Sequence, residues 1–125
     1  MIVARPRDRT PIPAAVIEQY DRLIATQPGV ERKGATMPYT SVNGHMFSYL
    51  AESGRLALRL PSPQREAFIE RFKTTLQEAY GFVQKEYVSV PEAVLADTHL
   101  LSQFFRASHA YVSGLKPKPT RRPAR

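Results

Sequence analysis

The sequence predicts a two-layer α+β domain, in which an antiparallel sheet carries helices on one face. The first observation is the stretch from Tyr39 to Leu60, which has the pattern of two β-hairpins that share a middle strand. The second is the alternating segment at residues 82–90, which predicts a further strand. The third is that apolar residues at helical spacing lie before, between and after these strands. Short turns between strands, with helices outside them, are typical of an α+β domain.

Two turns define the predicted hairpins. Asn43-Gly44 is the strongest short hairpin signal in the chain, because a type I′ turn needs positive φ at both corners and Asn-Gly accepts it at least cost. A second turn is expected at Ser53-Gly54, with the glycine in the left-handed position of a G1 bulge and Ala51 paired with Arg55. Together the two turns fix the register of three strands.

This register sorts the side chains of residues 39–60 onto two faces. The alternation of Leu56, Leu58 and Leu60 predicts that their face is covered by helices. The opposite face is expected to form an aromatic and cationic interaction surface, provided that no helix covers it. If the second loop closes one residue differently, Phe47 and Tyr49 move into the core instead. The predicted interaction surface consists of His45, Phe47, Tyr49, Arg55 and Arg59.

Apolar spacing predicts the helical segments. The first begins at Pro13 and ends before Pro28-Gly29. The second is expected over residues 62–80, with Gly81 as its C-terminal stop. A single turn over residues 91–95 precedes a last helix, which follows an aspartate N-cap and runs to about residue 114. The predicted core consists of Leu56, Leu58, Leu60, Phe68, Phe72, Leu76, Phe104 and Tyr111.

The basic excess lies at the two ends of the chain. Residues 1–11 contribute +2 and residues 116–125 contribute +5 to the net charge of +7, so residues 12–115 are neutral overall. Both ends combine prolines with cations, so we expect a flexible leader at 1–11, one domain at 12–115 and a disordered tail at 116–125. A solubilising role explains the tail most simply. Its candidate phosphate contacts are Lys116, Lys118, Arg121, Arg122 and Arg125.

Composition argues against several kinds of site. The absence of cysteine rules out disulfides, thiolate zinc sites and a cysteine nucleophile. His45, His99 and His109 include no pair at the i, i+4 spacing of helical metal ligands, and no GxSxG or glycine-rich phosphate motif occurs. We therefore expect no catalytic residue, no metal site and no cofactor. No apolar run approaches a membrane span of about 20 residues and no secretory signal is recognisable, which together predict a cytoplasmic protein with no membrane partner.

Five short segments match a known pattern in order and spacing. They are residues 29–33 (GVERK), 42–47 (VNGHMF), 56–60 (LALRL), 85–91 (KEYVSVP) and 115–119 (LKPKP). Together they resemble the N-terminal domain of the TfoX/Sxy family, over roughly residues 29–119. The resemblance implies a small bacterial α+β domain of the kind shared with YjbR-like and secretion-chaperone-like folds. In the named members this domain belongs to regulators of natural competence that act on transcription.

These observations favour a non-enzymatic interaction or regulatory domain of the TfoX N-terminal type. We expect it to use the open sheet face for self-association or for a protein partner. One alternative is weak nucleic-acid binding through the basic tail and the aromatic and arginine face. Another is a small enzyme of unrecognised chemistry. The neutral charge of residues 12–115 favours a protein contact over nucleic acid.

Overall fold

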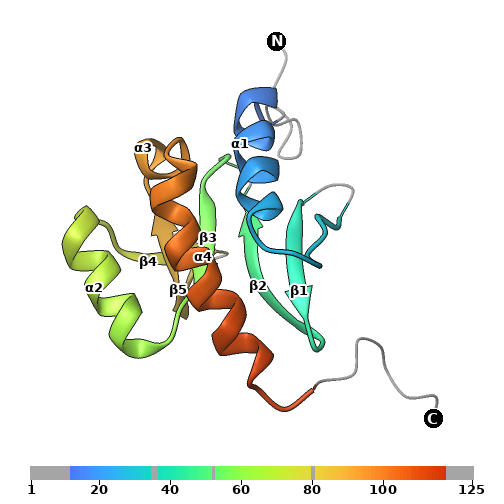
Figure 1. Cartoon of the computed structure of the whole chain (residues 1–125). Helices are drawn as coiled ribbons and strands as arrows, with labels where there is room; N and C mark the ends of the chain where they lie inside the picture. The colour runs from blue at the N-terminus through green and yellow to red at the C-terminus, as the bar shows by residue number, and fades with distance from the viewer. Residues whose placement is uncertain (1–11, 35–36, 52, 80, 118–125) are drawn as a thin grey trace.

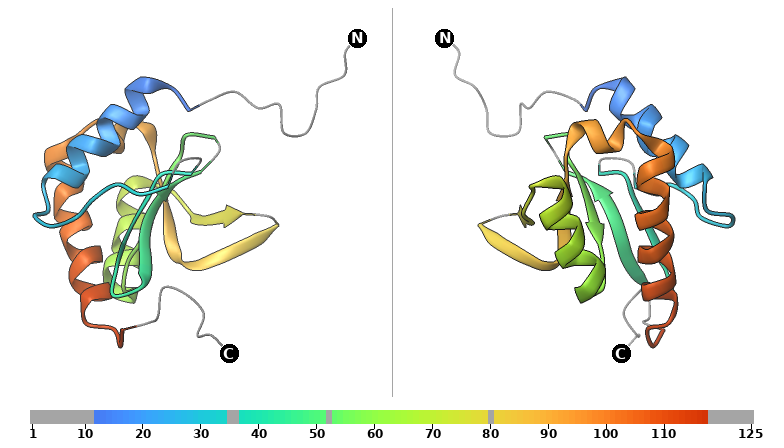
Figure 2. Two further views of the ribbon diagram at one scale, coloured as in Figure 1. Left: turned by 90° about the vertical axis from the view of Figure 1, so that its right-hand side faces the viewer. Right: turned by 60° about the vertical axis from the view of Figure 1, so that its left-hand side comes forward.

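The computed structural model describes residues 12–34, 37–51, 53–79 and 81–117 (Figure 1). In chain order the elements are α1 (Ala14–Ala25), β1 (Tyr39–Val42), β2 (His45–Leu50), β3 (Leu56–Arg59), α2 (Ser62–Phe72), β4 (Leu76–Ala79), β5 (Phe82–Val90), α3 (Glu92–Leu95) and α4 (Thr98–Ser113). The strands form one antiparallel sheet in the order β1-β2-β3-β5-β4. Helices α1, α2 and α4 lie on one side of it, so the predicted two-layer α+β architecture is confirmed (Figure 2).

Both predicted hairpin turns are present. Asn43 and Gly44 have φ values of 56° and 81°, as a type I′ turn requires. At the second turn Gly54 has a φ of 86°. The N–H of Ala51 donates to the carbonyl of Arg55 over 2.9 Å, which closes that hairpin with the predicted pair. These two turns place β1, β2 and β3 side by side.

Three of the four predicted helical segments also agree with the structure. α1 ends at Ala25, before Pro28-Gly29. α3 corresponds to the short turn expected at residues 91–95. α4 follows Asp97, whose Oδ1 accepts the N–H of Leu100 over 3.2 Å and so satisfies one of the free donors at the start of the helix.

The second predicted helix is wrong beyond Phe72. α2 ends there, and Lys73 takes a left-handed backbone conformation with φ 54° and ψ 48°. Gly81, with a φ of 81°, lies in the turn between β4 and β5 and terminates no helix. The hydroxyl of Thr74 donates to the carbonyl of Ser89 over 2.6 Å, which attaches the segment to β5. β4 consists of residues that favour helices, so pairing with β5 overrides local propensity.

The predicted sorting of side chains onto two faces is wrong at Phe47. The pairing of β2 with β1 shifts by one residue after Met46, which leaves Phe47 as an extra residue of β2. Such a β-bulge redirects the side chain of the strand that contains it. Phe47 consequently points toward the helices, and its ring centroid lies 5.4 Å from that of Phe105 in α4.

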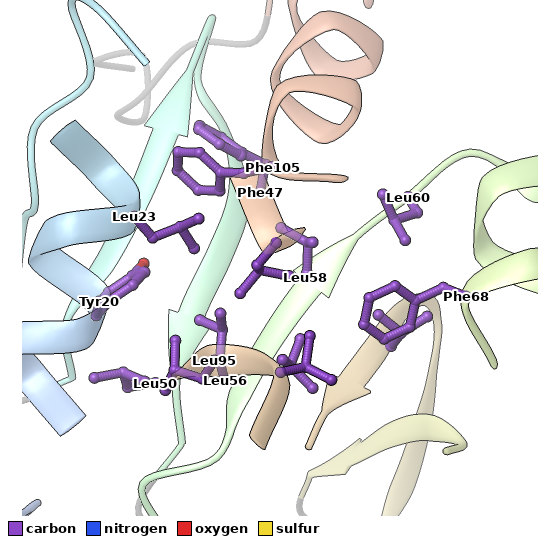
Figure 3. Packing of buried hydrophobic residues seen from close by; sticks show 14 of the residues in the cluster. Tyr20, Leu23, Phe47, Leu50, Leu56, Leu58, Leu60, Phe68, Leu95 and Phe105 are labelled. Carbon is purple, nitrogen blue, oxygen red and sulfur yellow. The ribbon is translucent and has the colours of Figure 1, made fainter. Parts of the chain in front are cut away.

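Buried apolar side chains fill the space between the sheet and the helices (Figure 3). Four of the eight predicted core residues are fully buried there: Leu56, Leu58, Leu60 and Phe68. Three others are partly buried and pack against this core: Phe72, Phe104 and Tyr111. Leu76 lies in β4 and lines no part of this core, because the helix that would have carried it inward ends at residue 72.

The hairpin of β4 and β5 projects from the sheet on the side opposite the helices (Figure 2). Its direction follows from the strand register. Leu76 pairs with Val88, but Gln77 pairs with Gln84, so residues 85–87 have no partner on β4. β5 leaves the plane of the sheet at this irregularity. We name residues 76–79 and 81–85 the wing.

Candidate protein-interaction surface

The five residues of the predicted interaction surface do not form one surface. Phe47 is fully buried, and its ring centroid lies 5.6 Å from that of His109 in addition to its contact with Phe105. Its prediction as a surface residue is wrong. The β-bulge in β2 is the cause, since the second turn closes with the predicted pairing.

Tyr49 lies on the sheet face opposite the helices, but it is only 4% exposed. Its hydroxyl donates to Oε1 of Gln84 in the wing, and its ring centroid lies 5.7 Å from that of Tyr87 in an edge-on arrangement. The hydroxyl of Tyr87 donates to the carbonyl of Met46 over 2.8 Å. Burial raises the pKa of Tyr87 to about 12. The base of the wing therefore covers a face that was expected to be open.

Both arginines of the predicted surface make polar contacts within the chain. Nε of Arg55 donates to Oγ of Ser89 over 2.8 Å. Arg59 pairs with Glu86 at 2.7 Å, and its guanidinium lies 5.7 Å from the ring centroid of Tyr111. The hydroxyl of Tyr111 donates to the other oxygen of Glu86 over 2.9 Å. Burial alone would raise the pKa of Glu86, but the hydrogen bonds from Arg59 and Tyr111 outweigh it and hold that pKa below its usual value.

His45 contacts the segment that follows α4. Its Nε2 lies 2.8 Å from the carbonyl oxygen of Lys116, and Nδ2 of Asn43 donates to the carbonyl of Ser113 over 3.0 Å. These two bonds attach the β1–β2 turn to the end of α4. Among the candidate phosphate contacts, Lys116 is exposed. The others lie outside the described residues: Lys118, Arg121, Arg122 and Arg125.

The tip of the wing carries apolar side chains in contact with solvent. Phe82 is 73% exposed and Val83 is 49% exposed. Consecutive residues of a strand point to opposite faces, so the tip is apolar on both sides. Sequence reasoning missed this surface because it assigned Gly81 to the end of a helix. Tyr80-Gly81, two residues between two short segments, is the signal that could have indicated a hairpin.

Two cavities adjoin the β2–β3 turn, and Ser53 and Arg55 line both. The first, of about 490 Å³, lies at the base of the wing and has a mainly polar lining that includes Thr75, Glu78 and Ser89. The second, of about 480 Å³, lies between α1, α3 and the turn, and we name it the α1–α3 cavity. Its lining is mainly apolar: Pro13, Ala15, Val16, Val90, Ala93, Leu95 and Ala96.

The buried side-chain polar atoms of the described residues all have hydrogen-bond partners. The hydroxyls of Tyr20 and Thr40 lie 2.7 Å and 2.6 Å from Oγ of Ser48, and burial raises the pKa of Tyr20. This network joins α1 to β1 and β2. Within the described ranges no group of three or more acidic or histidine side chains is placed to hold a metal ion. No helix in that part of the chain is long and apolar enough to cross a membrane.

The surface thus combines a wing with an apolar tip, a polar cavity at the base of the wing and an apolar cavity beside α3. Comparison with protein-family models, with curated proteins and with solved structures finds no match to this chain. A function is therefore inferred from the wing and from the segments that resemble the TfoX/Sxy family.

Proposed function

We propose that this chain is a non-enzymatic, cytoplasmic interaction domain of the TfoX N-terminal type, and that it recognises another protein through the tip of the wing. The segments at residues 42–47, 56–60 and 85–91 support the family assignment. They contribute to β2, β3 and β5, the three central strands of the sheet. A shared scaffold does not determine which partner is bound. We therefore expect the residues that recognise the partner to lie outside the central, paired part of the sheet. The tip of the wing meets this condition.

The exposure of Phe82 is the observation that carries this proposal. Five of the six phenylalanines belong to the core or pack against it, whereas Phe82 is 73% exposed. Burial of a phenylalanine side chain is worth roughly 1.5–3 kcal/mol. Val83 adds further apolar surface beside it. Aromatic side chains that protrude in this way are enriched at the centres of protein interfaces.

The base of the wing is anchored, which favours binding through its tip. Tyr49 bonds to Gln84 of β5, and Tyr87 bonds to the carbonyl of Met46 in β2. The first contact joins the wing to β2, and the second attaches β5 to β2 close to the point where the wing begins. A surface held in a fixed direction loses less conformational entropy on binding than a mobile loop does.

Site-specific photo-crosslinking tests the proposal. A photoreactive phenylalanine analogue replaces Phe82 in one variant and Glu70, an exposed residue of α2, in a matched control. In cells that naturally contain the protein, position 82 is expected to crosslink to one protein of defined mass, and position 70 is not. The same adducts at both positions, or none at either, would reject the wing as the recognition surface.

Nucleic-acid binding is the second candidate function. The observation that favours it is the five cations among residues 116–125. Such a tail contacts phosphates without reading base sequence, so its affinity falls steeply with salt. Residues 12–115 have no net charge, so they add no long-range attraction to the phosphates of a nucleic acid.

A further inference from the structure

We infer that the tip of the wing docks into the α1–α3 cavity of a second copy of this chain, so that two copies form a reciprocal dimer. This inference rests on the proposed function, in which the tip is the recognition surface. It adds the identity of the partner and the site that receives the tip.

The shape of the tip determines the kind of surface that can cover it. Phe82 and Val83 point to opposite faces of the hairpin, and both are exposed. A flat partner surface would cover only one of them. A cavity that encloses the hairpin tip covers both.

The α1–α3 cavity has a suitable size and lining. Its volume of about 480 Å³ falls within the range of roughly 300–1,000 Å³ for pockets that enclose small ligands. Val90 and Leu95, which belong to the core, form part of its lining. Ala93 and Ala96 near α3 are exposed and small, so they leave room for an aromatic ring.

Charged residues around the tip and around the cavity are complementary. Glu78 pairs with Val83 across the hairpin, and Lys85 lies two residues further along the same face, so both charges flank the tip. The cavity is lined by Arg55 and Glu92. The orientation that we infer for the second copy is the one in which Glu78 faces Arg55 and Lys85 faces Glu92, and these two charge pairs would disfavour other orientations.

The tip has no access to the cavity of its own chain. Figure 2 shows the wing projecting from the sheet on the side away from the helices, whereas α1 and the α3–α4 segment lie on the other side. A second copy must therefore supply the cavity. Two copies related by a twofold axis exchange tips through two equivalent contacts, which closes the assembly.

Light scattering over a concentration series tests the inference. The wild type is expected to reach twice the chain mass of 14.1 kDa. Phe82→Asp replaces the aromatic ring of the tip with a charge and Ala93→Arg fills the cavity, so each is expected to raise the dimer dissociation constant at least about 100-fold. Gln64→Arg, at an exposed position of α2, changes the net charge by the same amount as Ala93→Arg and is the control that is expected to remain dimeric.

Mixing the two variants separates docking from a general structural defect. Phe82→Asp retains the cavity and Ala93→Arg retains the tip, so an equimolar mixture is expected to form a heterodimer through one intact contact. A mixture no more associated than either variant alone would overturn the inference. So would a wild type that stays monomeric at about 1 mM, or a dimer that neither substitution weakens. A monomeric wild type that crosslinks at position 82 to a different protein would reject the second copy and leave the proposed function standing.

Discussion

At the scale of single residues, Glu86 joins three elements of the fold through one carboxylate. It accepts hydrogen bonds from Arg59 of β3 and from Tyr111 of α4, at 2.7 Å and 2.9 Å. Its side chain is 38% exposed, so water screens part of this interaction. The lowered pKa of Glu86 shows that the ionised form is the one the fold favours.

Glu86→Gln is expected to remove a pH-dependent part of the stability. Because folding holds the pKa of Glu86 below its usual value of 4.5, its ionised form stabilises the fold above that pH. This contribution is lost as the pH falls through the lowered pKa. Urea midpoints between about pH 7 and about pH 3 should therefore decrease more for the wild type than for Glu86→Gln. Parallel profiles for the two proteins would contradict the role assigned to this carboxylate.

Gly44→Val is expected to destabilise the domain by about 1 kcal/mol or more, because a β-branched residue resists positive φ. Gly44 has a φ of 81° in the β1–β2 turn. Gly114→Ala is the control, since Gly114 has a φ of −85° and an added Cβ would lie 3.6 Å from its nearest neighbour. Urea unfolding of both variants measures the difference, and equal stabilities would show that the turn conformation is not required.

At the scale of elements, the boundary between α2 and β4 shows which features the sequence can predict. The Asn43-Gly44 turn, α1 and α4 depend on local signals, namely turn residues, apolar spacing and caps, and these predictions are confirmed. The end of α2 depends on Lys73 in a left-handed conformation and on pairing between β4 and β5. The apolar pattern continues past residue 72 without any sign of that pairing, so it predicts a longer helix.

The candidate site was harder to predict than most of the fold, because it also depends on pairing between strands. Phe47 moved into the core because of a one-residue shift between β1 and β2. Tyr49 is covered because β5 bends and brings Gln84 over it. Both effects arise from pairing between strands, and neither leaves a signature in the alternation of residues 39–60. Phe82 became recognisable as a surface residue only once β4 was known to be a strand.

Lys73→Gly is expected to stabilise the domain by about 0.5 kcal/mol, because glycine adopts the left-handed conformation at the end of α2 without steric strain. Glu70→Gly within the same helix is the control and is expected to destabilise by about 1 kcal/mol. Thermal or urea unfolding of each variant measures its change in stability relative to the wild type. Equal losses of stability for both variants would contradict the left-handed conformation of Lys73.

At the scale of the whole molecule, the two sides of the sheet have different roles. One side packs against the helices and forms the core, whereas the other carries the wing (Figure 2). The net charge of +7 is a property of the two ends of the chain, because residues 12–115 are neutral. The proposed protein contact through the wing and the alternative phosphate contact through the tail therefore involve different parts of the chain and can be tested separately.

Truncation after Leu115 separates the two proposed binding functions. If the tail binds nucleic acid, the full chain should bind weakly and without sequence preference, with a log–log salt slope set by at most about five phosphates. The truncated chain should lose this binding and retain wing-dependent crosslinking. Fluorescence anisotropy with two DNA duplexes of unrelated sequence measures the nucleic-acid binding of both chains. Binding that discriminates between them at high salt would contradict a purely electrostatic tail.

Thiol accessibility in cells tests the central claim, that the wing is the recognition surface, most directly. The chain contains no cysteine, so Glu78→Cys beside Val83 and Glu70→Cys on α2 each introduce a single exposed reporter. In dilute purified protein the two thiols are expected to react with a maleimide at similar rates. In cells, the thiol at position 78 is expected to react at least about tenfold more slowly than the thiol at position 70, and added Phe82→Asp is expected to abolish this protection. Equal rates at the two positions in cells would contradict the claim.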